Sequence, residues 1–244
     1  MAISATRKKP VDLDLKRREF FGYMSEGVIL LQGRAGTGKT IGATCIAYNL
    51  REYFGKPVIL DYHATEAFGE YTYMGSKEVM AELNRLSGEI NSIKKKNAGE
   101  TAEKIRENLG IQMDNAVIVW DEGYRYLERR RTSDPMTLIY GYYLQIWRHY
   151  HNTVIICTPK LNYIDFRALN QATAELNCYP NFYITPTRVL GEQDPNKWVC
   201  RLKGLDTHTQ ETIALNVPVA KYGPMYDTWQ PIALRQKMIR RVEG

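Results

Sequence analysis

The chain has 244 residues, of which 44% are hydrophobic and 25% are charged, a balance typical of soluble globular proteins. That length is enough to bury one large core, so a mini-protein held together by disulfides is excluded. Lysine and arginine outnumber aspartate and glutamate by 33 to 27, and the net charge of +6 permits a polyanionic partner without requiring one.

The cysteines and the apolar runs restrict where the protein works. The four cysteines stand far apart without a C-x-x-C pair, so we expect neither zinc binding nor a disulfide framework, and a reducing cytoplasm is the natural location. No run approaches the roughly 18 apolar residues that span a bilayer. The N-terminus also lacks the apolar stretch of a secretory signal. We therefore expect no membrane insertion and no export.

Short apolar runs rich in valine and isoleucine recur along the chain. They have strand length and lie at residues 27–32, 57–62, 115–122, 153–158 and 181–185. Uninterrupted apolar runs are typical of strands buried on both faces. Residues 41–54 have the apolar spacing of a helix, which Gly55 and Pro57 end. Because long segments separate successive strands, we predict an α/β fold with a mostly parallel sheet flanked by helices.

The remaining segments complete the expected architecture. Residues 76–112 predict two helices divided by a lysine-rich stretch, and residues 135–150 predict a helix rich in aromatics. Alternating apolar and polar residues at 197–205 and 210–219 predict an antiparallel β-hairpin. We therefore expect three parts: a mobile arm or peripheral helix over 1–22, a core domain over 23–190, and a C-terminal hairpin and tail packed on the core over 191–244.

A glycine-rich loop directly follows the first predicted strand and opens the first predicted helix. Its sequence, GRAGTGKT, matches the phosphate-binding pattern G-x-x-x-x-G-K-[ST] in full. The N–H groups of such a loop surround a phosphate, Lys39 can neutralise the β and γ oxygens, and the Thr40 hydroxyl can bind Mg²⁺. We therefore predict binding of ATP with Mg²⁺. The predicted nucleotide-binding residues are Gly33, Arg34, Ala35, Gly36, Thr37, Gly38, Lys39, Thr40 and Ile41.

Two adjacent carboxylates, Asp121 and Glu122, end an apolar strand and so lie at the carboxyl edge of the predicted sheet, where ligands of such folds bind. Asp121 would hold Mg²⁺, directly or through water. Glu122 would orient and polarise the attacking water as a general base. A kinase has less need of such a glutamate, so the pair favours hydrolysis. Thr158 ends a third strand, where its hydroxyl would suit a γ-phosphate sensor.

Several cations could serve the same reaction from a neighbouring subunit, as an arginine that stabilises the charge on the transferred phosphate. The candidates for this arginine finger are Arg129, Arg130, Arg131, Arg148 and Arg167. We take Arg129 and Arg148 as candidate catalytic residues, although their spacing does not select one finger. The lysine cluster at 94–96 would suit a loop on a nucleic-acid backbone, although such charge runs more often form a solvated loop, which is the favoured interpretation.

The order of these motifs resembles the FtsK/HerA superfamily of DNA-pumping ATPases, over roughly residues 28–229. The chain is especially similar to viral genome-packaging ATPases and to the cytoplasmic part of zonula occludens toxin-like phage assembly proteins. GRAGTGKT, VIVWDEG and an arginine-rich stretch come first, followed by IWRHYHNTVIICTPKLNYIDFRAL and YGPMYDTWQ. The more specific features are the Arg148–His149 pair, a later I-D-x-R at 164–167, and Tyr226-Asp227-Thr228.

The resemblance implies a RecA-like P-loop NTPase of the type with an additional strand and a catalytic glutamate. It also implies a pentameric or hexameric ring that threads double-stranded DNA through a basic channel and hydrolyses ATP between neighbours. Lys39 and Thr40 would then be the phosphate and Mg²⁺ groups, and Thr158 would stand near the sensing position. Pro159 occupies the place where many members carry a sensor glutamine.

The leading hypothesis is a viral genome-packaging motor, located in the host cytoplasm or at the packaging vertex of the virion. A protein of the capsid vertex or a portal-like protein would be a further partner. The alternatives are a zonula occludens toxin-like filamentous phage assembly ATPase, a HerA-like helicase or translocase, an ATP-dependent switch or scaffold with little turnover, and a small-molecule kinase. Glu122 discriminates between motor and switch, because a switch needs no efficient base.

Overall fold

The computed structural model describes residues 13–75, 114–131, 150–184 and 189–226, together with residues 133, 137, 141 and 144. The strands are β1 (Gly27–Gln32), β2 (Val58–Leu60), β3 (Thr72–Tyr73), β4 (Val117–Trp120), β5 (Thr153–Thr158), β6 (Ala172–Pro180), β7 (Phe182–Ile184), β8 (Val189–Gly191), β9 (Val199–Asp206) and β10 (Thr212–Pro218). The α-helices are α1 (Leu13–Tyr23), α2 (Lys39–Phe54), α6 (Phe166–Leu169) and α7 (Val219–Tyr222). Short 3-10 turns are η1 (Gly123–Arg125), η2 (Arg129–Arg131), η4 (Leu161–Tyr163), η5 (Pro195–Lys197) and η6 (Gly223–Met225).

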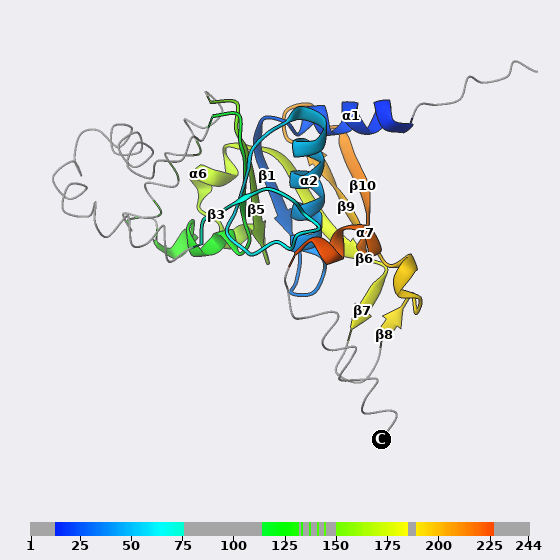
Figure 1. The fold of residues 1–244 in the computed structure, drawn as a ribbon. Helices are drawn as coiled ribbons and strands as arrows, with labels where there is room; N and C mark the ends of the chain where they lie inside the picture. Colours follow the sequence, from blue (N-terminus) through cyan, green and yellow to red (C-terminus); the bar gives the residue numbers. More distant parts are fainter. Residues whose placement is uncertain are drawn as a thin grey trace, which may run out of the picture.

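One eight-stranded sheet organises the fold, in the order β10-β9-β6-β1-β5-β4-β2-β3 (Figure 1). The six neighbouring strands β6, β1, β5, β4, β2 and β3 run parallel to one another. At one edge, β9 pairs antiparallel with β6, and β10 pairs antiparallel with β9. β5 lies between β1, which leads into the glycine-rich loop, and β4, which leads into the carboxylate pair. The predicted α/β class, the mostly parallel sheet and the additional strand are therefore confirmed.

The hydrophobic core lies on both faces of this sheet, because successive residues of a strand point to opposite sides. Ile29 of β1 shares one buried cluster with Ile46 of α2, which lies against the sheet in Figure 1. Leu30 belongs to the other cluster, with Leu127 and Ile164 from the segments that follow β4 and β5. Each of these side chains is almost fully buried, and burial of one such side chain contributes about 1.5–3 kcal/mol. The segments that pack on the two faces of the sheet thus fix the loops at its carboxyl edge.

The helix α2 follows the predicted apolar spacing and ends where the sequence indicates. Gly55 adopts a left-handed conformation with φ of 65°, and its N–H donates to the carbonyl of Arg51 over 2.8 Å. Such a glycine satisfies a carbonyl of the last turn that would otherwise lack a partner. Pro57, two residues further on, cannot continue a helix.

The prediction of a core strand at residues 181–185 is wrong. Phe182–Ile184 forms β7, which pairs with β8 in a separate two-stranded sheet. The strand that pairs with β1 on the side away from β5 is instead β6, Ala172–Pro180, which the sequence analysis missed. Buried and more exposed residues alternate along β6, because its other face is less covered than the strands at the centre. An alternating strand lacks the uninterrupted apolar run on which the prediction depended.

The predicted C-terminal hairpin is confirmed, since β9 and β10 pair antiparallel over their whole length. β9 also pairs with β6, so the hairpin extends the central sheet. At the other end of the chain, residues Leu13–Tyr23 form α1. Phe21 of α1 is buried and belongs to the cluster under α2.

Several predictions fall on other parts of the chain. The two helices at 76–112 with their lysine cluster, most of the helix at 135–150, and the end of the chain after Tyr226 lie outside the described residues. Within the described part, no helix is both long enough and apolar enough to cross a bilayer.

Candidate active site

The glycine-rich loop leaves the end of β1 and closes around one of its own carbonyl groups. The carbonyl oxygen of Arg34 accepts hydrogen bonds from the Thr37 N–H (3.2 Å), the Thr37 hydroxyl (2.8 Å) and the Lys39 ammonium (3.3 Å). The Gly33 N–H donates to the carbonyl of Thr158, which fastens the loop to β5. Lys39 is only 6% exposed, so its ammonium is held inside the loop where a phosphate would be bound.

Gly38 shapes the junction between the loop and α2. Its φ is 90°, a left-handed conformation that residues with a Cβ rarely adopt. A Cβ at this position would lie 2.8 Å from the Cys200 Sγ of β9, so the loop sits directly on the sheet. The Cys200 thiol donates to the carbonyl of Thr37 over 3.2 Å. The glycine is thus required both by its conformation and by the close approach of a neighbouring strand.

Thr40 and Asp121 bring the loop and the carboxylate pair together. The Thr40 hydroxyl donates to Asp121 Oδ2 over 2.9 Å. Asp121 Oδ1 is buried and has no hydrogen-bond partner among the described residues. A hydroxyl beside a carboxylate with an unused oxygen is the kind of donor set that Mg²⁺ prefers, completed in such sites by water and phosphate. The two side chains therefore fit the predicted ion.

The protonation of Asp121 depends on its surroundings. Burial raises the pKa of this carboxyl group, the hydrogen bond from Thr40 lowers it, the charge of Glu122 raises it, and the charge of Lys39 lowers it. A cation bound beside the group would favour its ionised form. Binding of a cation at this position would therefore lower the pKa of Asp121 again.

Asp61 is a site residue that the sequence analysis missed. It follows β2, and its Oδ1 accepts a hydrogen bond from the Asp121 N–H over 2.8 Å, while Oδ2 accepts one from the Tyr126 hydroxyl over 3.3 Å. Burial raises the pKa of Asp61 to about 8; the hydrogen bond from the Asp121 N–H lowers it, and the charge of Asp121 raises it. The available signal was a polar residue directly after an apolar strand, at the same sheet edge as Asp121.

Glu122, the residue after Asp121, has an unusual backbone conformation. Its φ is 61°, in the left-handed region, which costs a residue with a Cβ about 1–2 kcal/mol. The Glu122 carbonyl accepts a hydrogen bond from the Arg125 N–H over 2.9 Å, which closes the turn after β4. Strain of this kind persists where the surroundings fix it, and it concentrates at functional sites. The role of Glu122 as the general base stays a prediction.

Thr158 lies at the end of β5 as predicted, but its hydroxyl donates to the carbonyl of Lys160 over 2.9 Å. A second residue at this edge, Gln32, escaped the sequence analysis. Its amide nitrogen donates to Asn177 Oδ1 of β6 over 2.6 Å, and its oxygen accepts from the Leu161 N–H over 3.3 Å. Gln32 therefore connects the end of β1 with β6 and with the segment after β5, directly before the phosphate loop. A polar last residue on an apolar strand was the signal for it.

The candidate arginines lie in different surroundings. Arg129 and Arg130 are exposed on η2, close to the end of β4, whereas Arg148 lies outside the described residues. Arg167 pairs with Asp165, which is fully buried, at 3.2 Å. Because the loss of a partner would leave a buried charge, Arg167 is engaged in holding the fold.

With β5 between the two strands that carry loop and carboxylates, this geometry is that of a P-loop ATPase. The sequence model of the zonular occludens toxin (Zot) family matches residues 27–181, which is more than half of the chain. The chain therefore belongs to the Zot family. No curated protein matches it.

Solved structures with a similar fold include the N-terminal domain of zonular occludens toxin from Neisseria meningitidis. It is 14% identical, with 83% of this chain and 100% of that chain covered and a TM-score of 0.49. The genome packaging NTPase B204 from Sulfolobus turreted icosahedral virus 2, in complex with ATP-gammaS, is 14% identical, covering 78% and 96% with a TM-score of 0.46. A KaiC-like protein from Pyrococcus horikoshii is 13% identical, covering 78% and 84% with a TM-score of 0.39.

Proposed function

We propose that this protein is an ATP-driven translocase of double-stranded DNA that packages a viral genome. It works as a pentameric or hexameric ring, with ATP hydrolysed where two subunits meet. Residues 23–190 form the motor core, residues 191–244 its C-terminal extension and residues 1–22 its arm. The observation that carries the proposal is the hydrogen bond from Thr40 to Asp121, which sets Glu122, the next residue, at the same sheet edge as the phosphate loop.

The chemistry divides between the residues of this edge. The loop N–H groups and Lys39 bind the β and γ phosphates, and Thr40 with Asp121 holds Mg²⁺, which when bound neutralises phosphate charge. Glu122 accepts a proton from the attacking water, whose oxygen forms the new bond to the γ phosphorus. The bond from that phosphorus to the bridging oxygen breaks, and ADP leaves. Thr158, at the end of β5, is the sensor candidate.

An arginine from the neighbouring subunit completes the site in this proposal, with Arg129 and Arg148 as the candidates. The exposed position of Arg129 after β4 supports it, since a finger has to cross a subunit boundary. The net charge of +6 on each copy, multiplied around a ring, supports a channel that holds duplex DNA by its phosphates. A portal-like protein at the capsid vertex is the proposed further partner, and the host cytoplasm or the packaging vertex the proposed location.

ATP turnover measured with and without long duplex DNA tests this proposal. We expect duplex DNA to raise the rate of ATP hydrolysis several-fold. ATP hydrolysis should in turn drive displacement of a third strand from a triplex on the same DNA. Mass photometry with an ATP analogue and DNA should find about five or six copies per particle, as a closed ring of head-to-tail contacts implies. A protein that stays monomeric, or whose turnover ignores DNA, would contradict the motor.

Membership in the Zot family favours a second candidate, a filamentous phage assembly ATPase. This ATPase would share the site chemistry but would act on DNA leaving the cell and not on DNA entering a capsid. The two candidates differ in location. Fractionation of producing cells would find the protein with assembly proteins of the envelope in the second case, and with capsids in the first.

A further inference from the structure

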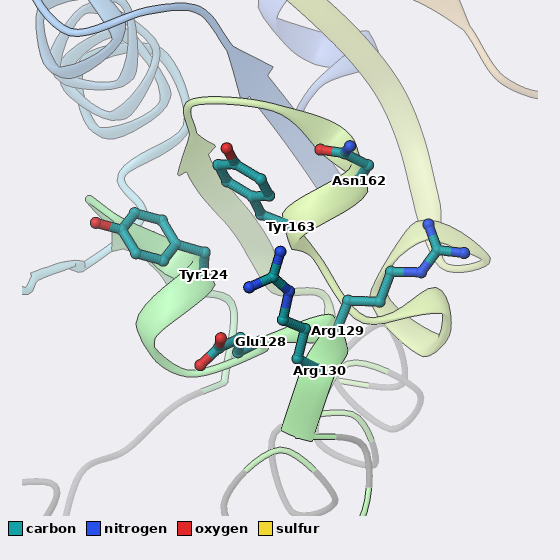
Figure 2. A pocket seen from close by; sticks show the side chains of 6 residues that line it. All are labelled: Tyr124, Glu128, Arg129, Arg130, Asn162 and Tyr163. Carbon is teal, nitrogen blue, oxygen red and sulfur yellow. The ribbon is translucent and has the colours of Figure 1, made fainter.

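A hollow opens beside the ATP site, between the turn that follows β4 and the turn that follows β5 (Figure 2). Its volume is about 570 Å³, within the range of ligand-binding clefts. The side chains that line it are Tyr124, Glu128, Arg129, Arg130, Asn162 and Tyr163. Apart from Arg129, a candidate arginine finger, its residues take no part in the predicted nucleotide site or in the mechanism above.

Two tyrosines give this hollow flat apolar surfaces. The rings of Tyr124 and Tyr163 lie edge to face, with centroids 6.4 Å apart and planes at 66°. Tyr124 also packs against the core cluster, which fixes its ring, whereas Tyr163 is 40% exposed. An exposed and supported aromatic ring is a platform on which a planar group can stack at little cost in entropy.

Cations stand beside these rings. Arg129 and Arg130 are both exposed, and Figure 2 draws the guanidinium group of Arg130 below the ring of Tyr163 and to one side of the ring of Tyr124. The carboxylate of Glu128 points away from that guanidinium group in the same view. The amide of Asn162 lines the hollow as well. A guanidinium group binds phosphate, and the rings beside it bind a base, so the two halves of one nucleotide find matching groups.

The walls of the hollow are joined to each other and to the ATP site. The Asp165 N–H donates to the carbonyl of Leu127 over 2.7 Å, and Glu128 forms an antiparallel bridge with Ile164. The wall formed by the turn after β4 begins at Glu122, whose backbone is in the strained left-handed region. A strand bound here would therefore touch the two segments that leave β4 and β5.

We propose that this hollow binds an unpaired nucleotide of a single-stranded nucleic acid, with its phosphate on Arg130 and Asn162 and its base stacked on Tyr163. A duplex also offers phosphates, but its bases are stacked within the helix and cannot lie on the ring. The site thus prefers a single strand, whereas the proposed motor acts on duplex DNA. Neither ATP hydrolysis nor translocation is needed for this binding.

Fluorescence anisotropy with a labelled oligodeoxythymidylate and with a duplex of equal length tests the site on the full chain. Tyr163→Ala should weaken single-strand binding by about 5- to 150-fold, the loss expected for one stacked base. Its salt dependence should not change, and duplex binding should stay within about twofold. Tyr163→Phe keeps the ring and should bind like the wild type. Arg130→Ala should weaken binding and also reduce the salt slope by about 0.7, the share of one single-strand phosphate.

Matched controls lie elsewhere on the described surface. Tyr23→Ala removes a tyrosine that is 83% exposed on α1, and Arg201→Ala removes an exposed arginine of β9; both should leave single-strand binding unchanged. Lys39→Ala should lose ATP and still bind the single strand, which separates this site from the ATPase. Unchanged binding in Tyr163→Ala, or an equal loss with duplex, would overturn the proposal, as would an equal loss in Tyr23→Ala.

Discussion

Replacement of Gly38 by alanine should destabilise the empty protein by two separate effects. The φ of 90° costs a residue with a Cβ about 1–2 kcal/mol. The new Cβ would also lie 2.8 Å from Cys200 Sγ and 3.0 Å from Cys200 Cβ, and overpacking of this kind costs about 1–3 kcal/mol. We therefore expect Gly38→Ala to lower the free energy of unfolding by about 2–5 kcal/mol.

Gly36→Ala is the matched control for the first of these effects. Gly36 has a φ of 77°, but a Cβ there would meet nothing within 4 Å. Its replacement should therefore cost only the conformational part, about 1–2 kcal/mol. The difference between the two variants measures the contact between the loop and β9.

Urea unfolding without nucleotide, followed by tryptophan fluorescence and circular dichroism, measures both variants. Cys200→Ala, combined with Gly38→Ala in a double-mutant cycle, should relieve part of the clash and give a coupling of about 1 kcal/mol. The loop would not rest on Cys200 if Gly38→Ala cost no more than Gly36→Ala, or if the coupling fell below about 0.5 kcal/mol.

Three further predictions concern buried polar groups. Asp61→Ala should lower the free energy of unfolding by about 1–3 kcal/mol, because the Asp121 N–H loses its acceptor. Asp61→Asn keeps an acceptor and should lower it less, as measured by urea unfolding at pH 7. Equal losses in the two variants would argue against this role of Asp61. Arg167→Ala should lower the free energy of unfolding by about 3–5 kcal/mol, because the buried Asp165 keeps the N–H of residue 167 but loses the guanidinium group that balances its charge. Arg129→Ala should be nearly neutral, and a small loss in Arg167→Ala would contradict the pairing. Burial raises the pKa of Cys45 to about 12, and all four cysteines are buried, so a thiol reagent should react only after denaturation; fast reaction of the native protein would refute this.

The sequence predicted the parts of the fold in which local pattern and tertiary environment agree. β1 and β5 are covered on both faces, so their apolar runs were sufficient to identify them. β6 has one less covered face, and its alternating residues carried a weaker signal that could not be told from a loop. The segment 181–185 has the composition of a core strand, but its partner is β8, which no local pattern could reveal.

The active site divides in the same way. The phosphate loop and the carboxylate pair have short, fixed spacing, so the sequence was enough to propose their residues as a site. Asp61 and Gln32 act through contacts with residues far away in the chain, namely Asp121 and Asn177. Such contacts depend on strand order, which one sequence does not display.

The central claim is that the glutamate after β4 drives ATP hydrolysis at the phosphate loop. Phosphate release by Glu122→Gln, measured beside wild type and the exposed control Glu211→Gln, tests it most directly. We expect Glu122→Gln to bind an ATP analogue as tightly as wild type and to lose at least about 100-fold in turnover, the contribution of a general base, with Glu211→Gln unchanged. Turnover by Glu122→Gln at the wild-type rate would contradict the assignment.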